Sequence, residues 1–131
     1  DNIEAISIID RYLEHPRVYV FHNRGEPEYL FGSADLMTRN IDYRVEVLCP
    51  IKDPSIQTQL QDILDQQWYD NTKARVLDKE QANAKRERGK TTPVLQAQET
   101  IHRYLSSGKK PRMPRSLMRQ ASKRRRSSPS R

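Results

Sequence analysis

The C-terminal end of the chain carries a concentration of charge that a folded core cannot accommodate. Ten of the 24 Lys and Arg residues lie between Lys109 and Arg131, and this stretch contains no acidic residue. Its charges repel one another and it has few apolar residues to bury, so we expect a disordered tail. The other 14 basic residues face 17 acidic ones, which gives residues 1–108 a net charge of −3. The fold must therefore come from a mildly acidic body.

The length of 131 residues suits a single domain. We expect a folded body over residues 1–106 and the basic tail over residues 107–131. The chain begins with Asp1 rather than Met, so we expect it to be a fragment of a longer protein. Its one cysteine, Cys49, excludes an internal disulfide and suits a reducing compartment. No apolar run approaches the roughly 20 residues of a membrane span. These features favour a cytoplasmic protein and leave peripheral membrane association open.

Three short segments are typical of β-strands. They are rich in β-branched and aromatic residues and cover residues 18–21, 28–34 and 44–51. The first two flank the turn sequence NRGEP, which predicts a hairpin. The third becomes wholly apolar toward its end, which predicts a central strand.

Helices are expected on both sides of these strands. Apolar residues at helical spacing predict helices over residues 3–13 and 54–69, and a third from Thr92 to near Gly108. Residues 78–92 have almost no apolar side chain and indicate an exposed loop. The sequence therefore predicts an α/β fold: a small mixed sheet of at least three strands, covered by helices, followed by the tail.

The stretch EHPRVYVFHN places His15 two residues before Arg17, at the entry to the first strand. Residues at this spacing share one face of a strand. A solvated surface pair is the ordinary explanation, and a phosphate site is the functional one. A guanidinium offers a fixed set of donors that matches phosphate oxygens. Arg39 and Arg44 are further candidate phosphate ligands, although Arg44 could instead pair with a neighbouring carboxylate.

Further along the chain, Gly32-Ser33-x-Asp35 follows the second strand, and Glu46 comes thirteen residues after Ser33. Together with His15-x-Arg17 this order resembles the half-site H-x-K…G-S-x-N…E of the phospholipase D superfamily. The match has departures, because Arg17 replaces the lysine and Asp35 replaces the asparagine.

The segments SIIDRYLEHPRVYVFHN, SADLMTRNIDYRVEVLCPIKDP and DNTKARVLD resemble a more specific family, the C-terminal domain of polyphosphate kinase. The resemblance covers residues 2–106 and implies the phospholipase D-like fold. It implies reversible transfer of the terminal phosphate of ATP to polyphosphate, through a phosphohistidine in a preceding domain. The expected partners are ATP, ADP, polyphosphate and the remaining domains, with Mg²⁺ on the nucleotide phosphates. A homo-oligomer stays open.

The resemblance also assigns roles to individual residues. The family histidine at the position of His15 is essential, which implies acid–base and phosphate contacts there. Arg17 and Ser33 would bind phosphate oxygens, and Arg39 and Arg44 would assist them. Glu46 would hold the His15 ring in one tautomer. We expect no metal-ligand cluster within this chain.

Two other functions remain open at this point. A phospholipase D-like phosphodiesterase would use His15 as its nucleophile, but a second H-x-K motif is absent. A non-enzymatic polyanion- or RNA-binding module would use the arginine-rich tail, because such tails bind phosphate backbones without reading sequence. Deleting residues 109–131 would abolish binding only in the second of these functions.

Overall fold

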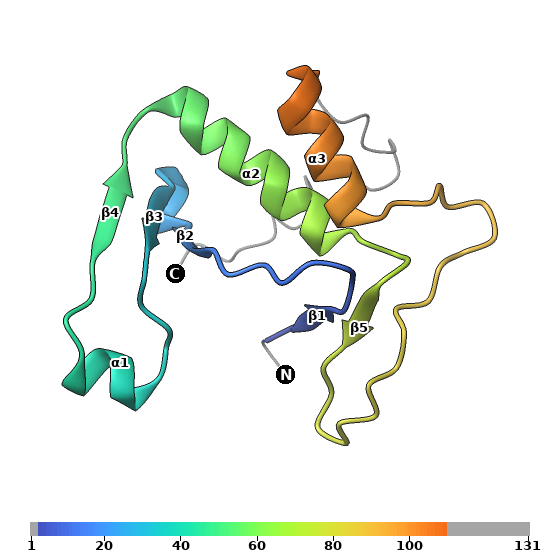
Figure 1. Cartoon of the computed structure of the whole chain (residues 1–131), viewed down its shortest axis with the longest axis horizontal. Coiled ribbons are helices and arrows are strands. Elements are labelled where there is room, and N and C mark those ends of the chain that lie inside the picture. The colour runs from blue at the N-terminus through green and yellow to red at the C-terminus, as the bar shows by residue number, and fades with distance from the viewer. Residues whose placement is uncertain (1–2, 110–131) are drawn as a thin grey trace. The chain divides into compact units, whose positions relative to one another are not determined.

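A computed structural model describes residues 3–109, in which strands and helices form two compact units (Figure 1). One unit comprises residues 13–60, and the other comprises residues 3–12 together with residues 61–109. The α/β class predicted from the sequence is confirmed. The tail lies mostly outside the described residues, so its disorder and the boundary at residue 106 stay predictions.

The unit of residues 13–60 contains a three-stranded sheet in the order β2-β3-β4. Its strands are β2 (Arg17–Phe21), β3 (Glu28–Gly32) and β4 (Leu48–Ile51). The short helix η1 (Asn23–Gly25) joins β2 to β3, and the positive φ of Gly25 (101°) suits the reversal. The predicted hairpin is confirmed. Both strand pairs are antiparallel, so the sheet is not mixed, as expected for strands joined by short connections.

The third predicted strand differs most from expectation. It begins at Leu48 rather than at residue 44, and it pairs only with β3 among the described residues. Pro50 has no N–H to donate, which suits an edge position, so β3 is the central strand. The preceding connection contains a helix that the sequence did not predict, α1 (Thr38–Tyr43). The cover by helices is incomplete within this unit, because Phe21 and Phe31 remain 53% and 46% exposed.

The close approach of β3 to the segment before β4 depends on Gly32. A Cβ atom at this position would overlap the carbonyl oxygen of Val47 and the side chain of Leu48. The backbone N–H of Ser33 donates to the same carbonyl at 3.1 Å. The absence of a side chain at Gly32 therefore brings Ser33 beside the residues that precede β4.

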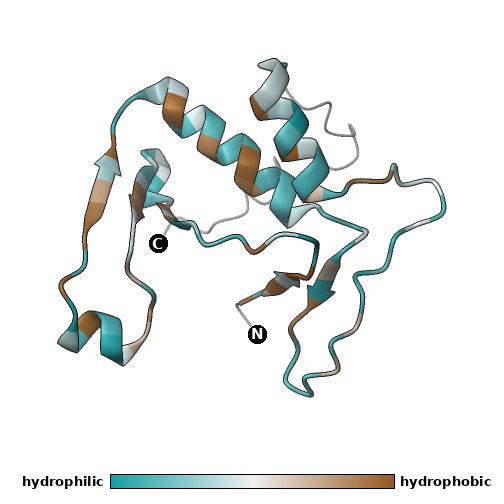
Figure 2. Ribbon diagram, in the orientation of Figure 1, coloured by the Kyte–Doolittle hydropathy of each residue, from teal (hydrophilic) through white to brown (hydrophobic). Residues whose placement is uncertain are grey.

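The helix predicted over residues 54–69 is confirmed as α2 (Pro54–Trp68). Asp53 caps its start, because its Oδ1 accepts the backbone N–H groups of Ser55 at 2.7 Å and Ile56 at 3.4 Å. Pro54 follows at the first helical position, where its missing N–H costs nothing. Figure 2 shows apolar and polar residues alternating in bands along this helix. The cap at Asp53, the proline after it and the apolar spacing were therefore sufficient to predict this helix.

The helix predicted over residues 3–13 is wrong. That segment contains β1 (Ile6–Ile8), which pairs antiparallel with β5 (Ala74–Val76), Ile6 lying opposite Val76. Ile6 and Ile8 are β-branched and suit a strand as well as a helix. The decision came from a partner strand almost 70 residues away, which no local pattern reveals.

The last helix, α3 (Ala97–Ser107), begins later than the predicted start at Thr92. The residues before it are held in an extended form, because the N–H of Leu95 donates to Asn71 Oδ1 at 2.9 Å. Gly108 ends the helix with a positive φ of 63°, as its position predicted. The loop expected over residues 78–92 is also confirmed, and its side chains are mostly exposed.

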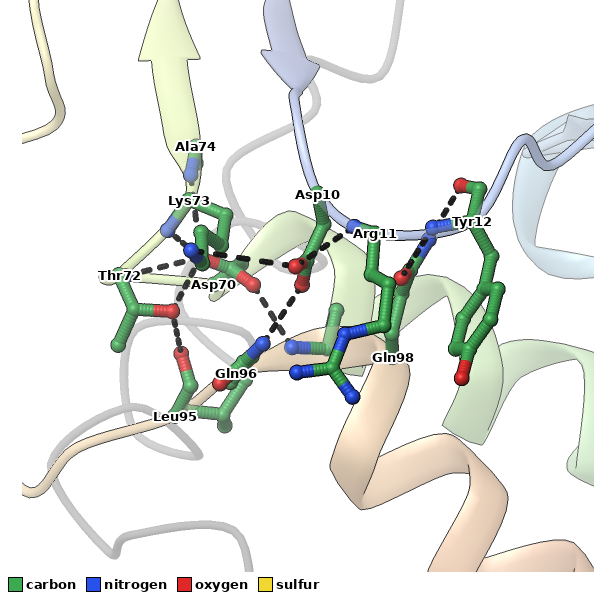
Figure 3. Close-up of polar contacts among 11 residues, drawn as sticks. Asp10, Arg11, Tyr12, Asp70, Thr72, Lys73, Ala74, Leu95, Gln96 and Gln98 are labelled. Atoms are coloured by element: carbon green, nitrogen blue, oxygen red, sulfur yellow. Dashed lines mark hydrogen bonds and ion pairs between the residues drawn. The ribbon is translucent and has the colours of Figure 1, made fainter.

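A buried carboxylate organises the unit of residues 3–12 and 61–109 (Figure 3). Asp70 is fully buried, and its Oδ1 accepts the N–H groups of Thr72, Lys73 and Ala74 at 2.7–3.1 Å. Its Oδ2 accepts the N–H of Ala97 at 2.7 Å, at the start of α3. One carboxylate thus fixes the approach to β5 and caps a helix distant in sequence. The buried hydrophobic side chains of this unit are Tyr69, Ala74, Leu95, Ala97, Ile101 and Tyr104.

The segment that follows β1 is joined to the same helix by side-chain amides (Figure 3). Gln98 and the backbone of Tyr12 exchange two hydrogen bonds of 3.0 and 2.6 Å, and Gln96 donates to Asp10 at 2.8 Å. Within residues 3–109, every helix is too short or too polar to cross a bilayer.

Candidate functional site

An arginine held by a carboxylate lies at the start of β2. The Nε and Nη2 atoms of Arg17 donate to the two carboxylate oxygens of Asp35 at 2.8 and 3.2 Å. The Arg17 and Asp35 side chains are 18% and 32% exposed. Asp35 reaches this position because Ser33 and Ala34 leave the end of β3 beside β2, where Tyr19 donates its hydroxyl to the Ala34 carbonyl at 2.5 Å. The bidentate pair fixes the plane of the guanidinium.

The ring of His15 lies against the other side of the same guanidinium. Its Nδ1 is 2.7 Å from Arg17 Nη1, and its Nε2 is 2.5 Å from Nη2. A neutral imidazole has a single acceptor nitrogen, so only one of these contacts can be a hydrogen bond. A protonated ring would have none. The spacing H-x-R therefore places an imidazole and a permanent cation together at an exposed position, and a ligand with oxygen acceptors can reach both.

The predicted contact between Glu46 and His15 is not present. The carboxylate of Glu46 instead accepts the hydroxyl of Ser33 at 2.5 Å and the side-chain N–H of Asn40 at 2.7 Å. Both ring nitrogens of His15 face Arg17. The cause is geometric. Glu46 lies in the segment before β4, and this segment approaches β3 closely enough to bring Glu46 to Ser33. We therefore do not assign Glu46 to orienting the imidazole.

The hydroxyl of Ser33 is engaged on both sides. It donates its single proton to Glu46, and its oxygen accepts the backbone N–H of Val47 at 3.3 Å. In this arrangement Ser33 has no proton to offer a phosphate oxygen, which is the role expected from the sequence. Its position instead connects the end of β3 to the segment before β4.

Arg39 and Arg44 lie close enough to this group to act on its charges. The hydrogen bond from Arg17 is the main cause of the lowered pKa of Asp35, and the charge of Arg39 adds to it. The hydrogen bonds from Ser33 and Asn40 are the main cause for Glu46, and the charge of Arg44 adds to them. Both arginines are exposed, and neither forms an ion pair within residues 3–109. All six site residues predicted from the sequence lie in the unit of residues 13–60, and the three arginines among them supply the positive charge of this set: His15, Arg17, Ser33, Arg39, Arg44 and Glu46.

Hydrogen bonds shift the titration of both carboxyls in the site. The bond from Arg17 lowers the pKa of Asp35 below 3.8, and the bonds from Ser33 and then Asn40 lower the pKa of Glu46 below 4.5. Asp35 in turn raises the pKa of Arg17, which stays fully charged. The site therefore carries ionised carboxylates and an ionised guanidinium at neutral pH.

Acid is expected to release these contacts. A carboxylate with a lowered folded-state pKa stabilises the folded site above its ordinary pKa, and this stabilisation is lost as the pH falls through the lowered value. We expect Asp35 and Glu46 to titrate below 3.8 and 4.5 when their carboxyl carbons are followed by NMR. Titration at or above those values would contradict the hydrogen bonds described here.

Two contributors to the site escaped the sequence analysis. Asp35 was part of the motif G-S-x-D, but its bond to Arg17 was not predicted and is shown only by the fold. Asn40 lies on α1 in a polar stretch, where nothing in its sequence context indicated burial. Its 2% exposure and its bond to Glu46 follow from the tertiary structure.

Comparison with known proteins adds to this geometry. The profile of a family described as polyphosphate kinase C-terminal domain 2 matches residues 1–98, about three-quarters of the chain. The chain belongs to the polyphosphate kinase C-terminal domain 2 family. The polyphosphate kinases of Salmonella typhimurium and Vibrio cholerae are each 51% identical to it, over 85% and 84% of the chain. The Escherichia coli K12 polyphosphate kinase is 50% identical over 85% of the chain.

A solved structure agrees with this assignment. The crystal structure of polyphosphate kinase from Porphyromonas gingivalis matches with a TM-score of 0.77 and 38% sequence identity, over 82% of this chain. The aligned part is 16% of that chain, and the chain likewise spans 16% of the Salmonella, Vibrio and Escherichia polyphosphate kinases. The polyphosphate kinase family resemblance seen in the sequence is thus confirmed for one domain.

Proposed function

We propose that this domain contributes the phosphate-holding part of an ATP:polyphosphate phosphotransferase. The complete reaction transfers the terminal phosphate of ATP to polyphosphate, giving ADP and a polymer longer by one unit, and it is reversible. The phosphoryl group is carried between them by a histidine of another domain. The observation that supports this proposal is the half-buried Arg17 guanidinium, fixed by Asp35 on one side and adjoining the exposed His15 imidazole on the other.

The residues of the site suit the charge of this substrate. Phosphoryl transfer needs positioning and stabilisation of negative oxygens more than covalent chemistry. Arg17 would donate to phosphate oxygens, with Arg39 and Arg44 adding charge around it. His15 would leave Arg17 for the substrate and donate or accept a proton there. The proposed role of Ser33 and Glu46 is to hold the end of β3 in place through their hydrogen bond.

Magnesium is a proposal for the nucleotide phosphates only. Within residues 3–109, no cluster of three His, Cys, Asp or Glu side chains could hold a metal ion. Asp35 is engaged by Arg17, and Glu46 is engaged by Ser33 and Asn40. These residues do not fit a magnesium site, so no step of the proposal passes through a metal.

Binding of inorganic tripolyphosphate to the 131-residue chain tests the proposal. We expect calorimetry to detect saturable binding that Arg17→Gln weakens at least tenfold, because the neutral amide cannot replace a charged fork of donors. Truncation of the basic residues 109–131 should leave the Arg17-dependent part of the binding in place.

Two results would refute the proposal. One is binding that survives Arg17→Gln unchanged, and the other is binding that disappears with residues 109–131. The second result would favour a polyanion-binding tail over a phosphate site in the folded body.

A further inference from the structure

Asn40 is a buried amide in which the nitrogen has a hydrogen-bond partner and the oxygen has none within the described residues. It is 2% exposed, and its Nδ2 donates to Glu46 Oε1 at 2.7 Å. Its Oδ1 is buried without a hydrogen-bond partner within the described residues. A buried acceptor without a partner destabilises a fold, and an apolar side chain would avoid that cost. What Asn40 contributes is therefore the donor that it directs at Glu46.

Glu46 has attractive alternatives to its present position. Arg17 lies opposite Gly32 in the register of β2 and β3, and Glu46 is bonded to Ser33, the next residue. After the hydrogen bonds from Ser33 and Asn40, the charges of Arg44 and Arg17 also lower the pKa of Glu46, so both guanidinium groups attract its carboxylate. Arg17 already shares its charge with Asp35 through a bidentate pair. A second carboxylate at Arg17 would change the net charge of the Arg17–Asp35 pair from zero to −1 and repel an incoming phosphate.

We propose that Asn40 is a positioning residue that holds Glu46 on Ser33 and away from Arg17, leaving the guanidinium available to phosphate. The inference rests on the proposed phosphate site at Arg17 and names what keeps that site open. Asn40 does not touch the substrate. Its hydrogen bond keeps the Glu46 carboxylate on Ser33 instead of on Arg17.

A double-mutant comparison tests the inference through tripolyphosphate binding to the 131-residue chain. In Asn40→Leu the amide donor is lost, Glu46 becomes free to turn to Arg17, and we expect about tenfold weaker binding. Adding Glu46→Gln removes the competing charge. The double variant should then bind within about twofold of the Glu46→Gln single variant. A role in folding alone would not produce this rescue.

A second variant and a matched control separate the role of Asn40 from general destabilisation. Asn40→Asp keeps the size of the side chain but repels the Glu46 carboxylate, so it should weaken binding as Asn40→Leu does. Gln66 is also a buried amide whose Oε1 lacks a partner within residues 3–109, and its Nε2 donates to the Asp62 carbonyl at 3.0 Å. Gln66→Leu should leave the affinity unchanged, and circular dichroism should show that each variant is folded.

Different results would overturn the role of Asn40 and the phosphate site at Arg17. Wild-type affinity in Asn40→Leu would overturn the inference, as would a loss that Glu46→Gln does not rescue, or unfolding of both Asn40 variants. In each case an Arg17-dependent phosphate site would stand. Absence of any Arg17-dependent binding in the wild-type chain would instead overturn the proposed function, and this inference with it.

Discussion

Lysine in place of Arg17 is expected to lower kcat/KM by about 10²–10³-fold in a complete polyphosphate kinase that carries this domain. This is the scale of removing one preorganised donor from a developing negative oxygen. Arg17 uses Nε and Nη2 to hold Asp35 and has its remaining N–H groups beside His15. A lysine ammonium is a single point of charge and cannot keep a planar bidentate pair while facing a phosphate. Steady-state rates of polyphosphate synthesis from ATP measure the effect.

A second arginine in a strand provides the control. Arg75 lies in β5, is not part of the site, and donates from Nη1 to the carbonyl of Asn83 at 2.9 Å. Arg75→Lys preserves the charge at a residue whose side chain bonds the loop after β5, so it should change kcat/KM by less than about threefold. If Arg17→Lys retained activity within the same range, the bidentate geometry would have no part in the reaction.

Removal of the Asp70 carboxylate is expected to have the largest effect on stability. Asp70→Ala should lower the free energy of unfolding by about 3–5 kcal/mol, since it leaves four backbone N–H groups without their acceptor, and each buried one costs about 1–3 kcal/mol. The N–H groups of Ala74 and Ala97 are fully buried and dominate the loss. Urea unfolding followed by circular dichroism measures the change.

Asp78 offers a matched carboxylate in a different setting. It accepts the backbone N–H of Ala82 at 2.9 Å within the exposed loop, where water can replace it. Asp78→Ala should therefore change the free energy of unfolding by no more than about 0.5 kcal/mol. An Asp70→Ala chain as stable as Asp78→Ala would show that the N–H groups around Asp70 find other partners.

Prediction from sequence succeeded where the signal was local. The hairpin of β2 and β3 follows from a turn sequence between two β-rich segments, and α2 follows from its cap at Asp53 and its apolar spacing. The spacing of His15 and Arg17 likewise predicted a shared face. In each case the residues that decide the structure lie within a few positions of one another, so their order along the chain already contains the interaction.

The partners of side chains and strands were decided by the tertiary structure. Residues 6–8 form a strand because β5 pairs with them, and α3 starts at Ala97 because Asp70 accepts its first N–H. Glu46 bonds Ser33 rather than His15 because the missing side chain of Gly32 lets β3 approach Val47. A sequence shows which groups can bond. When a group has several possible partners, it bonds the one that the folded backbone brings within about 3 Å, the distance at which a hydrogen bond forms.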